Sequence, residues 1–214
     1  MSADFALKEY LAERKKLVDR TLDDLLPCGT GDPPLIFEAV RYSIFAGGKR
    51  LRPILCMAAA EAVGGEKEAV LPAACALEMI HTYSLIHDDL PAMDNDDFRR
   101  GKPTSHKVFG EGMAVLAGDA LLTEAFRVLC NSDRMPGVPA DRILWVAREI
   151  AEAAGFFGMV GGQVKDLLAE GEDIDLPGLY SIHRLKTGAL ILASLRSGAI
   201  LAGAAEEPLA RLSD

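Results

Sequence analysis

The sequence predicts an all-α fold built from long helices. Half of its 214 residues are hydrophobic and only 6% are aromatic, and Ala and Leu, both strong helix formers, are abundant. Apolar residues recur with the 3.6-residue period of amphipathic helices, and no alternating run is long enough to predict a sheet. No linker divides the chain and no internal repeat is visible. We therefore expect one all-α domain over residues 1–214.

The first two helices are bounded by residues that break helices. Apolar residues spaced three and four apart predict an amphipathic helix over 7–25, which Pro27 stops. The turn-rich stretch 27–34 leads to a second helix over 35–46, and the pair Gly47-Gly48 ends it.

The next helices follow a basic loop. Pro53 favours the first turn of a third helix that runs to Val63. The helix over 66–90 is apolar nearly all round, which predicts a central, buried position. Pro72 either disturbs its first turn or marks its true start. Later helices are expected over 112–131, 140–170 and 176–203, the last capped by Asp175, and Pro208 opens a further short one.

Charge and cysteine content narrow the class of protein. A net charge of −9 and a pI near 5.0 argue against nucleic acid or an anionic membrane surface as the main partner. The charged N-terminus does not resemble a signal peptide, and apolar runs such as 189–195 are too short to span a bilayer. The cysteines lack disulfide or metal spacing, so we expect a reducing, cytoplasmic location: Cys28, Cys56, Cys75 and Cys130.

An acidic segment ends the apolar helix and predicts a metal site. Five carboxylates lie within residues 88–97, and Asp88 and Asp89 stand at a helix C-terminus, where the helix dipole disfavours negative charge. A solvated acidic turn would not explain acids placed at the end of a buried helix. The spacing does not match an EF-hand. All-oxygen ligands suit Mg²⁺, which commonly bridges carboxylates to substrate phosphates.

Two basic clusters predict an anionic ligand. Residues 47–52 combine two glycines with Lys49, Arg50 and Arg52, and Arg99, Arg100 and Lys102 follow the acids. Taken alone, 47–52 could be an exposed turn, and it lacks the pattern of a P-loop. Together with a metal site in an acidic chain, the two clusters indicate diphosphate chemistry.

Several ordered motifs resemble those of the short-chain trans-prenyl diphosphate synthases, most closely the bacterial farnesyl diphosphate synthases. The similarity extends from about residue 35 to 204, with the acidic segment and its following Arg-Arg-Gly-Lys-Pro-Thr as the most specific part. The motifs are GGKRLRP (47–53), HTYSLIHDDLPAMD (81–94), RRGKPT (99–104), AGDA (117–120), GQ (162–163) and KTGAL (186–190).

The resemblance implies an isoprenoid synthase fold, with antiparallel helices around a central cavity, and usually a homodimer. It implies condensation of isopentenyl diphosphate with an allylic diphosphate, dimethylallyl or geranyl, with Mg²⁺ as cofactor. On the family pattern, Asp88, Asp89 and Asp94 hold Mg²⁺ against the allylic diphosphate, to which Arg99 also binds. Isopentenyl diphosphate is contacted by Lys49, Arg52, His81 and Arg100. The reacting carbons are lined by Gln163, Lys186 and Thr187.

Each of these residues also has an ordinary structural interpretation. His81 could be a core histidine, Lys186 and Thr187 a snorkelling lysine beside a buried threonine, and Gln163 a helix-packing contact. His87 is expected to be structural. Asp119 and Asp166 are expected to support their neighbours.

The residue chemistry agrees with the implied reaction. Metal and Arg/Lys charges neutralise the departing pyrophosphate, leaving an allylic cation that the alkene of isopentenyl diphosphate attacks before a proton is lost. Such a cation needs a dry cavity with a few oxygen dipoles. The Thr187 hydroxyl, the Lys186 carbonyl and the Gln163 amide could supply them, and pyrophosphate is a plausible base.

Product length is expected to depend on Tyr83 and Ser84. They lie five and four positions before Asp88, about 6 to 8 Å along the helix. A bulky Tyr83 should stop a growing tail early, which predicts the C15 product farnesyl diphosphate. Asn95 instead matches the acidic loop of many geranylgeranyl diphosphate synthases, so a C20 product stays open.

The chain departs from the family in lacking a second aspartate-rich motif. No Asp-Asp pair follows Arg100, and the acids between 170 and 175 do not match that motif. We expect that the sequence is truncated at its C-terminus before the motif and that the 214-residue chain alone is inactive. The alternatives are a non-catalytic partner subunit of a prenyl synthase and, less favoured, a metal-dependent phosphohydrolase.

Overall fold

The computed structural model describes residues 6–27 and 33–213, and they form the expected all-α bundle. Cys28 and most of the turn-rich stretch 27–34 lie outside the described residues. The helices are α1 Leu7–Leu25, α2 Pro34–Ile44, α3 Leu51–Ala62, α4 Lys67–Asp88, α5 Ser105–Phe109, α6 Glu111–Leu129, α7 Ala140–Ala154, α8 Met159–Ala169, α9 Leu176–His183, α10 Ala189–Leu201 and α11 Glu206–Arg211. A 3₁₀ turn, Ser132–Arg134, and a π-helical turn, Arg184–Gly188, complete the helical elements.

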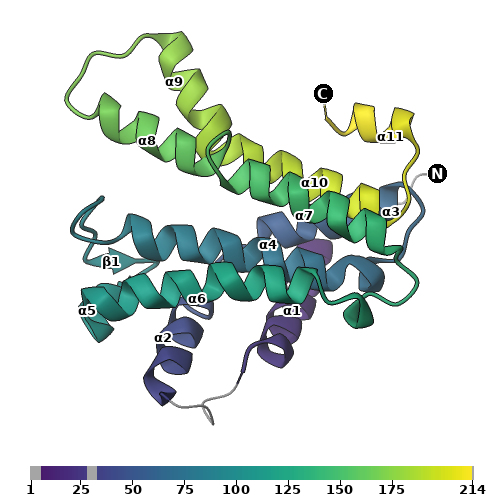
Figure 1. Ribbon diagram of the computed structural model, residues 1–214, viewed down its shortest axis with the longest axis horizontal. Coiled ribbons are helices and arrows are strands. Elements are labelled where there is room, and N and C mark those ends of the chain that lie inside the picture. The colour runs from purple at the N-terminus through teal and green to yellow at the C-terminus, as the bar shows by residue number, and fades with distance from the viewer. Residues whose placement is uncertain (1–5, 28–32, 214) are drawn as a thin grey trace.

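Helix α4 forms the centre of the bundle, as its composition predicts. In Figure 1, α4 and α6 run side by side through the middle, with α7 to α10 on one side and α1 and α2 on the other. By length and apolar composition alone α4 could span a membrane, contrary to our expectation that all apolar runs are too short. However, 78% of its apolar window is buried inside the molecule, so the bundle itself accounts for its composition.

The proline in α4 does not mark the start of the helix. Helix α4 begins at Lys67, and Pro72 lies within it, buried among its neighbours. The first turn therefore forms ahead of the proline.

Two of the expected long helices are interrupted. The helix expected over 140–170 is two helices, because the chain turns at Gly155–Gly158. A Cβ at Gly158 would lie 2.5 Å from the carbonyl carbon of Ala153, so only glycine fits that turn. The helix expected over 176–203 is capped by Asp175, which accepts a hydrogen bond from the Gly178 N–H at 2.8 Å, but it contains the π-helical turn 184–188.

A small β-hairpin follows the acidic segment, where we expected no sheet. Strands β1 Phe98–Arg99 and β2 Lys102–Pro103 pair antiparallel. Arg100 and Gly101 form the turn with φ of 55° and 78°, the left-handed pair that two-residue hairpins require. Strands this short carry no recognisable alternation, which is why periodicity misses them.

Candidate active site

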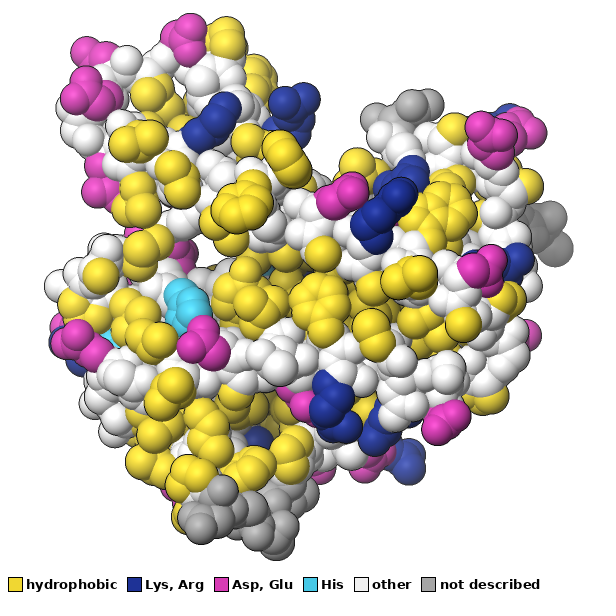
Figure 2. Space-filling model, in the orientation of Figure 1, with side chains coloured by type: hydrophobic (Ala, Val, Ile, Leu, Met, Phe, Trp, Pro, Cys, Tyr) yellow, Lys and Arg dark blue, Asp and Glu magenta, His cyan; other side chains and the backbone are white. Residues whose placement is uncertain are grey.

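A cavity of about 450 Å³ lies between the C-terminal half of α4, helix α8 and the π-helical turn Arg184–Gly188. Figure 2 shows the molecule hollowed between the α8–α9 part and the body that contains α4 and α6, with hydrophobic side chains gathered around the hollow. Eight of the residues expected at the site line this cavity: Arg52, His81, Tyr83, Ser84, Asp88, Gln163, Lys186 and Thr187. The structure thus brings together side chains from four separate sequence motifs.

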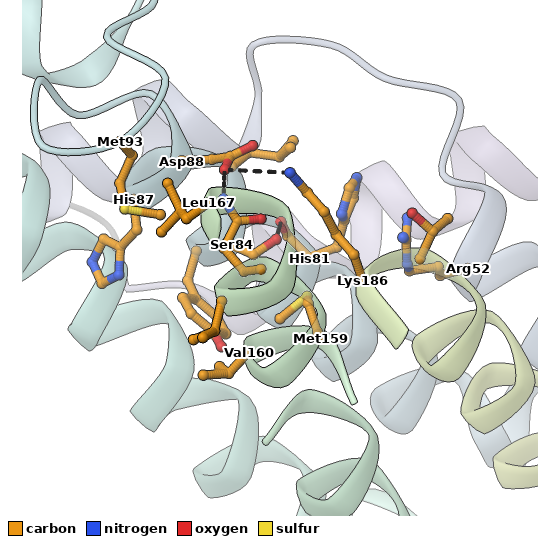
Figure 3. Close-up of a pocket in the computed structure, with 15 residues that line it drawn as sticks. Arg52, His81, Ser84, His87, Asp88, Met93, Met159, Val160, Leu167 and Lys186 are labelled. Atoms are coloured by element: carbon orange, nitrogen blue, oxygen red, sulfur yellow. Dashed lines mark hydrogen bonds and ion pairs between the residues drawn. The ribbon is translucent and has the colours of Figure 1, made fainter. Parts of the chain in front are cut away.

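The polar end of the cavity is organised around Asp88. Gln163 Nε2 donates a hydrogen bond to Asp88 Oδ1 at 2.6 Å, and Lys186 Nζ lies 3.8 Å from the same oxygen (Figure 3). Lys186 also donates to Asp166 Oδ2 at 2.6 Å, so Asp166 supports its neighbour as expected. Burial raises the pKa of Asp88; the charge of Lys186 opposes this effect and that of Asp94 adds to it. A cation next to Asp88 would favour its ionised form.

The backbone of the π-helical turn places Lys186 and Thr187 at this end. Gly162 of α8 packs directly on the turn: a Cβ there would overlap the Lys186 backbone nitrogen and lie 2.6 Å from its Cα. This close approach puts the next residue, Gln163, within reach of Asp88. Because Nε2 of Gln163 is the atom bonded to Asp88, its amide oxygen stays available as an acceptor. Single-turn π bulges of this kind are frequent at functional sites.

The other acids of the motif have different surroundings. Asp89 is buried and accepts from Arg99 Nε at 2.6 Å and Nη2 at 2.5 Å, beside a small cavity under the hairpin. Burial raises the pKa of Asp89, and Arg99 opposes that rise. Asp94 is exposed, and its N–H donates to the carbonyl of Asp88 at 2.9 Å. Arg99, expected to bind diphosphate, is therefore held on Asp89, with Asp96 at 3.5 Å.

The donor set fits Mg²⁺ held jointly with a phosphate. Within residues 6–27 and 33–213, no group of three or more His, Cys, Asp or Glu side chains is gathered closely enough to hold a metal. Magnesium is usually bound by one or two carboxylates plus waters and substrate phosphates, so it does not need such a cage. Asp88, which lines the cavity, and Asp94, whose charge acts on Asp88, would offer those carboxylates, whereas Asp89 is paired with Arg99.

A second cavity, of about 620 Å³, holds the basic residues expected to bind a diphosphate. Lys49, Arg52, His81 and Arg100 line it, and Arg52 and His81 also line the first cavity. Arg52 Nε is buried without a hydrogen-bond partner among the described residues. Burial and the charges of Arg52 and Arg100 lower the pKa of His81 to about 3. This concentration of positive charge, with one unpaired buried nitrogen on Arg52, is an arrangement that an anion would satisfy.

Arg50, which lies between two of these basic residues in sequence, is not part of the anion site. Its side chain is 2% exposed and ion-paired with Glu78 at 2.9 Å and Asp19 at 2.7 Å, and it donates to the Ile44 carbonyl. Its φ of 54° turns the chain at the start of α3. Arg50 therefore holds the GGKRLR loop in place and leaves Arg52 free to face the cavities.

The far end of the first cavity is apolar. Tyr83, 7% exposed, and Ser84 lie below Asp88 on α4, as helix geometry predicts. In Figure 3, Met159 and Val160 lie at the end opposite Asp88 and Lys186. Sequence analysis did not identify the α8 wall, which consists of Met159, Val160, Val164 and Leu167.

Comparison with known proteins gives consistent matches. Residues 33–214 match the polyprenyl synthetase family. The chain is 52% identical over 212 residues to a geranylgeranyl diphosphate synthase of Cyanophora paradoxa, covering 99% of this chain and 69% of the relative. It is 48% identical over 202 residues to a farnesyl diphosphate synthase of Geobacillus stearothermophilus, covering 94% of this chain and 67% of that one. Several other relatives are longer, and the chain spans between 53% and 60% of their length.

The fold agrees with these matches. The backbone superposes on a crystal structure of an FPP/GFPP synthase from Zymomonas mobilis with a TM-score of 0.90 and 42% identity, covering 97% of this chain and 74% of that one. The expected isoprenoid synthase fold is thereby confirmed. The chain belongs to the polyprenyl synthetase family, in agreement with its motifs.

Proposed function

We propose that this site condenses isopentenyl diphosphate with dimethylallyl or geranyl diphosphate. The observation that carries the proposal is the joint position of Arg52 and His81, which line both the basic cavity and the cavity that contains Asp88. An anion bound among the basic residues and a second diphosphate at Asp88 would place their carbon chains in one shared apolar space.

The allylic diphosphate binds at Asp88, Asp89 and Asp94 in this proposal. Mg²⁺ bound there with the diphosphate would neutralise charge on the leaving group. Lys186 adds a fixed positive charge, and its pKa is raised because its bond to Asp166 and the charge of Asp88 outweigh burial. Arg99 orients Asp89 by the ion pair between them.

The allylic cation forms when the bond between carbon and diphosphate oxygen breaks. Gln163, Thr187 and Lys186 line the cavity, and in this proposal the Gln163 amide oxygen, the Thr187 hydroxyl and the Lys186 carbonyl stabilise the cation as dipoles beside the apolar α8 wall. Lys49, Arg52, His81 and Arg100 hold isopentenyl diphosphate so that its alkene attacks the cation. A proton then leaves the new carbon chain, and the released pyrophosphate is the nearest base.

We propose farnesyl diphosphate, C15, as the main product, with geranylgeranyl diphosphate, C20, as the alternative. The bulk of Tyr83 at the apolar end of the cavity supports the shorter product. The relatives named above include synthases of both products, so family membership alone favours neither.

The proposal includes a homodimer in the cytoplasm. Exposed apolar side chains on α6 and α7, among them Leu116 at 54%, Leu144 at 72% and Trp145 at 41%, offer apolar surface that a partner could cover. The thiols of Cys56 and Cys75 are free and buried, as suits a reducing compartment.

The test is an incubation of the 214-residue chain, and in parallel of the complete product of its gene, with Mg²⁺, isopentenyl diphosphate and either primer. Products are resolved by chain length. A C15 product supports both the chemistry and the role given to Tyr83, and a C20 product supports the chemistry while refuting that role. If neither protein makes any product with either primer, catalysis is refuted, and a partner-subunit role replaces it.

A further inference from the structure

His87 lines the first cavity next to Tyr83, although its sequence position suggested only a structural role. In Figure 3 it lies on the side of the cavity opposite Arg52. Its ring packs edge-on against Tyr83, with centroids 5.7 Å apart and planes at 75°. Its Nε2 lies 3.0 Å from the Val115 carbonyl of α6. The imidazole thus lies between α6 and the cavity, one helical turn from Tyr83, with its side chain 30% exposed.

Gly118 of α6 creates the space that this imidazole occupies. A Cβ at Gly118 would overlap His87 Nε2 and lie 2.5 Å from Cδ2 and 2.9 Å from Cε1. Gly118 lies inside the helix, where glycine costs about 1 kcal/mol relative to alanine. Glycine is therefore needed at this position because it leaves room for the His87 ring, and not because of its backbone conformation.

We propose that Gly118 and His87 together set the width of the cavity beside Tyr83 and so help to determine product length. The inference rests on the proposed function, because it requires a prenyl tail that grows along this cavity. With α6 behind the imidazole and the cavity in front, bulk added at residue 118 moves the ring into the cavity. Removal of the ring widens the cavity instead. Tyr83 then forms one wall of the limiting space and His87 the adjacent one.

The test compares two substitutions with opposite expected effects. In Gly118→Ala, the ratio of the longest product to the product one isoprene unit shorter should fall on the order of tenfold. This is the discrimination expected when a hydrophobic pocket loses room for about one methylene group. In His87→Ala the same ratio should rise. The double variant should behave like His87→Ala, because no imidazole remains to be displaced. The KM for isopentenyl diphosphate should stay unchanged in Gly118→Ala, since its expected site lies around Arg52 and Arg100.

Gly112→Ala is the matched control. It lies in the same helix, and a Cβ there meets nothing within 4 Å, so it should leave the product ratio unchanged. An unchanged ratio in Gly118→Ala, or a double variant that keeps the shortened products, would overturn the inference and leave the proposed function intact. If Gly118→Ala makes no product, the double variant decides, since recovery of longer products supports the inference and continued inactivity refutes it. The variants are made in the complete product of the gene, and an inactive unsubstituted form of that protein would overturn both.

Discussion

Replacement of His81 by Gln should make the protein more resistant to acid. Burial and the nearby charges of Arg52 and Arg100 lower the pKa of His81 to about 3, whereas in the unfolded chain it is about 6.5. Below that upper value the unfolded state binds a proton that the folded state rejects. The unfolding free energy therefore decreases as the pH falls from about 6.5 to 3. At neutral pH His81 causes no such decrease.

The size of the effect follows from the two pKa values. At about pH 5, the pKa of His81 in the unfolded chain lies about 1.5 units above the pH, while the folded chain binds almost no proton there. This gap corresponds to about 2 kcal/mol of unfolding free energy. Urea unfolding of the unsubstituted chain and of His81→Gln, followed at about pH 7 and about pH 5, measures it. The unsubstituted chain should lose about 2 kcal/mol more than the variant over that interval.

Pyrophosphate supplies an independent check of the same reasoning. An anion that binds Arg52 and Arg100 would offset their charges, raise the pKa of His81 and reduce the acid sensitivity of the unsubstituted chain. The variant should lack this change. Equal losses in both proteins between the two pH values would refute the reasoning, because His81 would then titrate alike in the folded and unfolded states.

Three further substitutions test the packing of the site. Arg50→Met should lower the unfolding free energy by about 3–5 kcal/mol, because it leaves the buried Glu78 carboxylate unpaired. Calorimetry measures this loss. The double variant Arg50→Met with Glu78→Leu should recover much of the lost stability, because it also removes the unpaired carboxylate. Gly162→Ala should lower the unfolding free energy by about 1–3 kcal/mol and reduce kcat, because the added Cβ forces α8 away from Lys186. An unchanged kcat in a stable variant would contradict this. Tyr83→Ala should shift products toward longer chains in the same assay, and an unaltered distribution would show that the tail does not reach Tyr83.

The order of the helices, the central place of α4 and the position of Asp88 at its end could all be predicted from the sequence. These features depend on local periodicity, on caps and breakers, and on a helix rise that fixes how far Tyr83 lies from Asp88. The breaks at Gly155–Gly158 and at the π-helical turn were missed, because the apolar pattern continues across them.

Which polar side chains meet could not be predicted from the sequence, because it depends on how the folded chain packs. Gln163 and Asp88 are 75 residues apart and are joined because Gly162 lets α8 approach the π-helical turn. Arg50 and Arg52 are chemically alike and nearly adjacent, yet one is neutralised by Glu78 and the other faces the cavities. Whether a charge is paired or available depends on neighbours that folding brings from distant segments, and no local pattern encodes that choice.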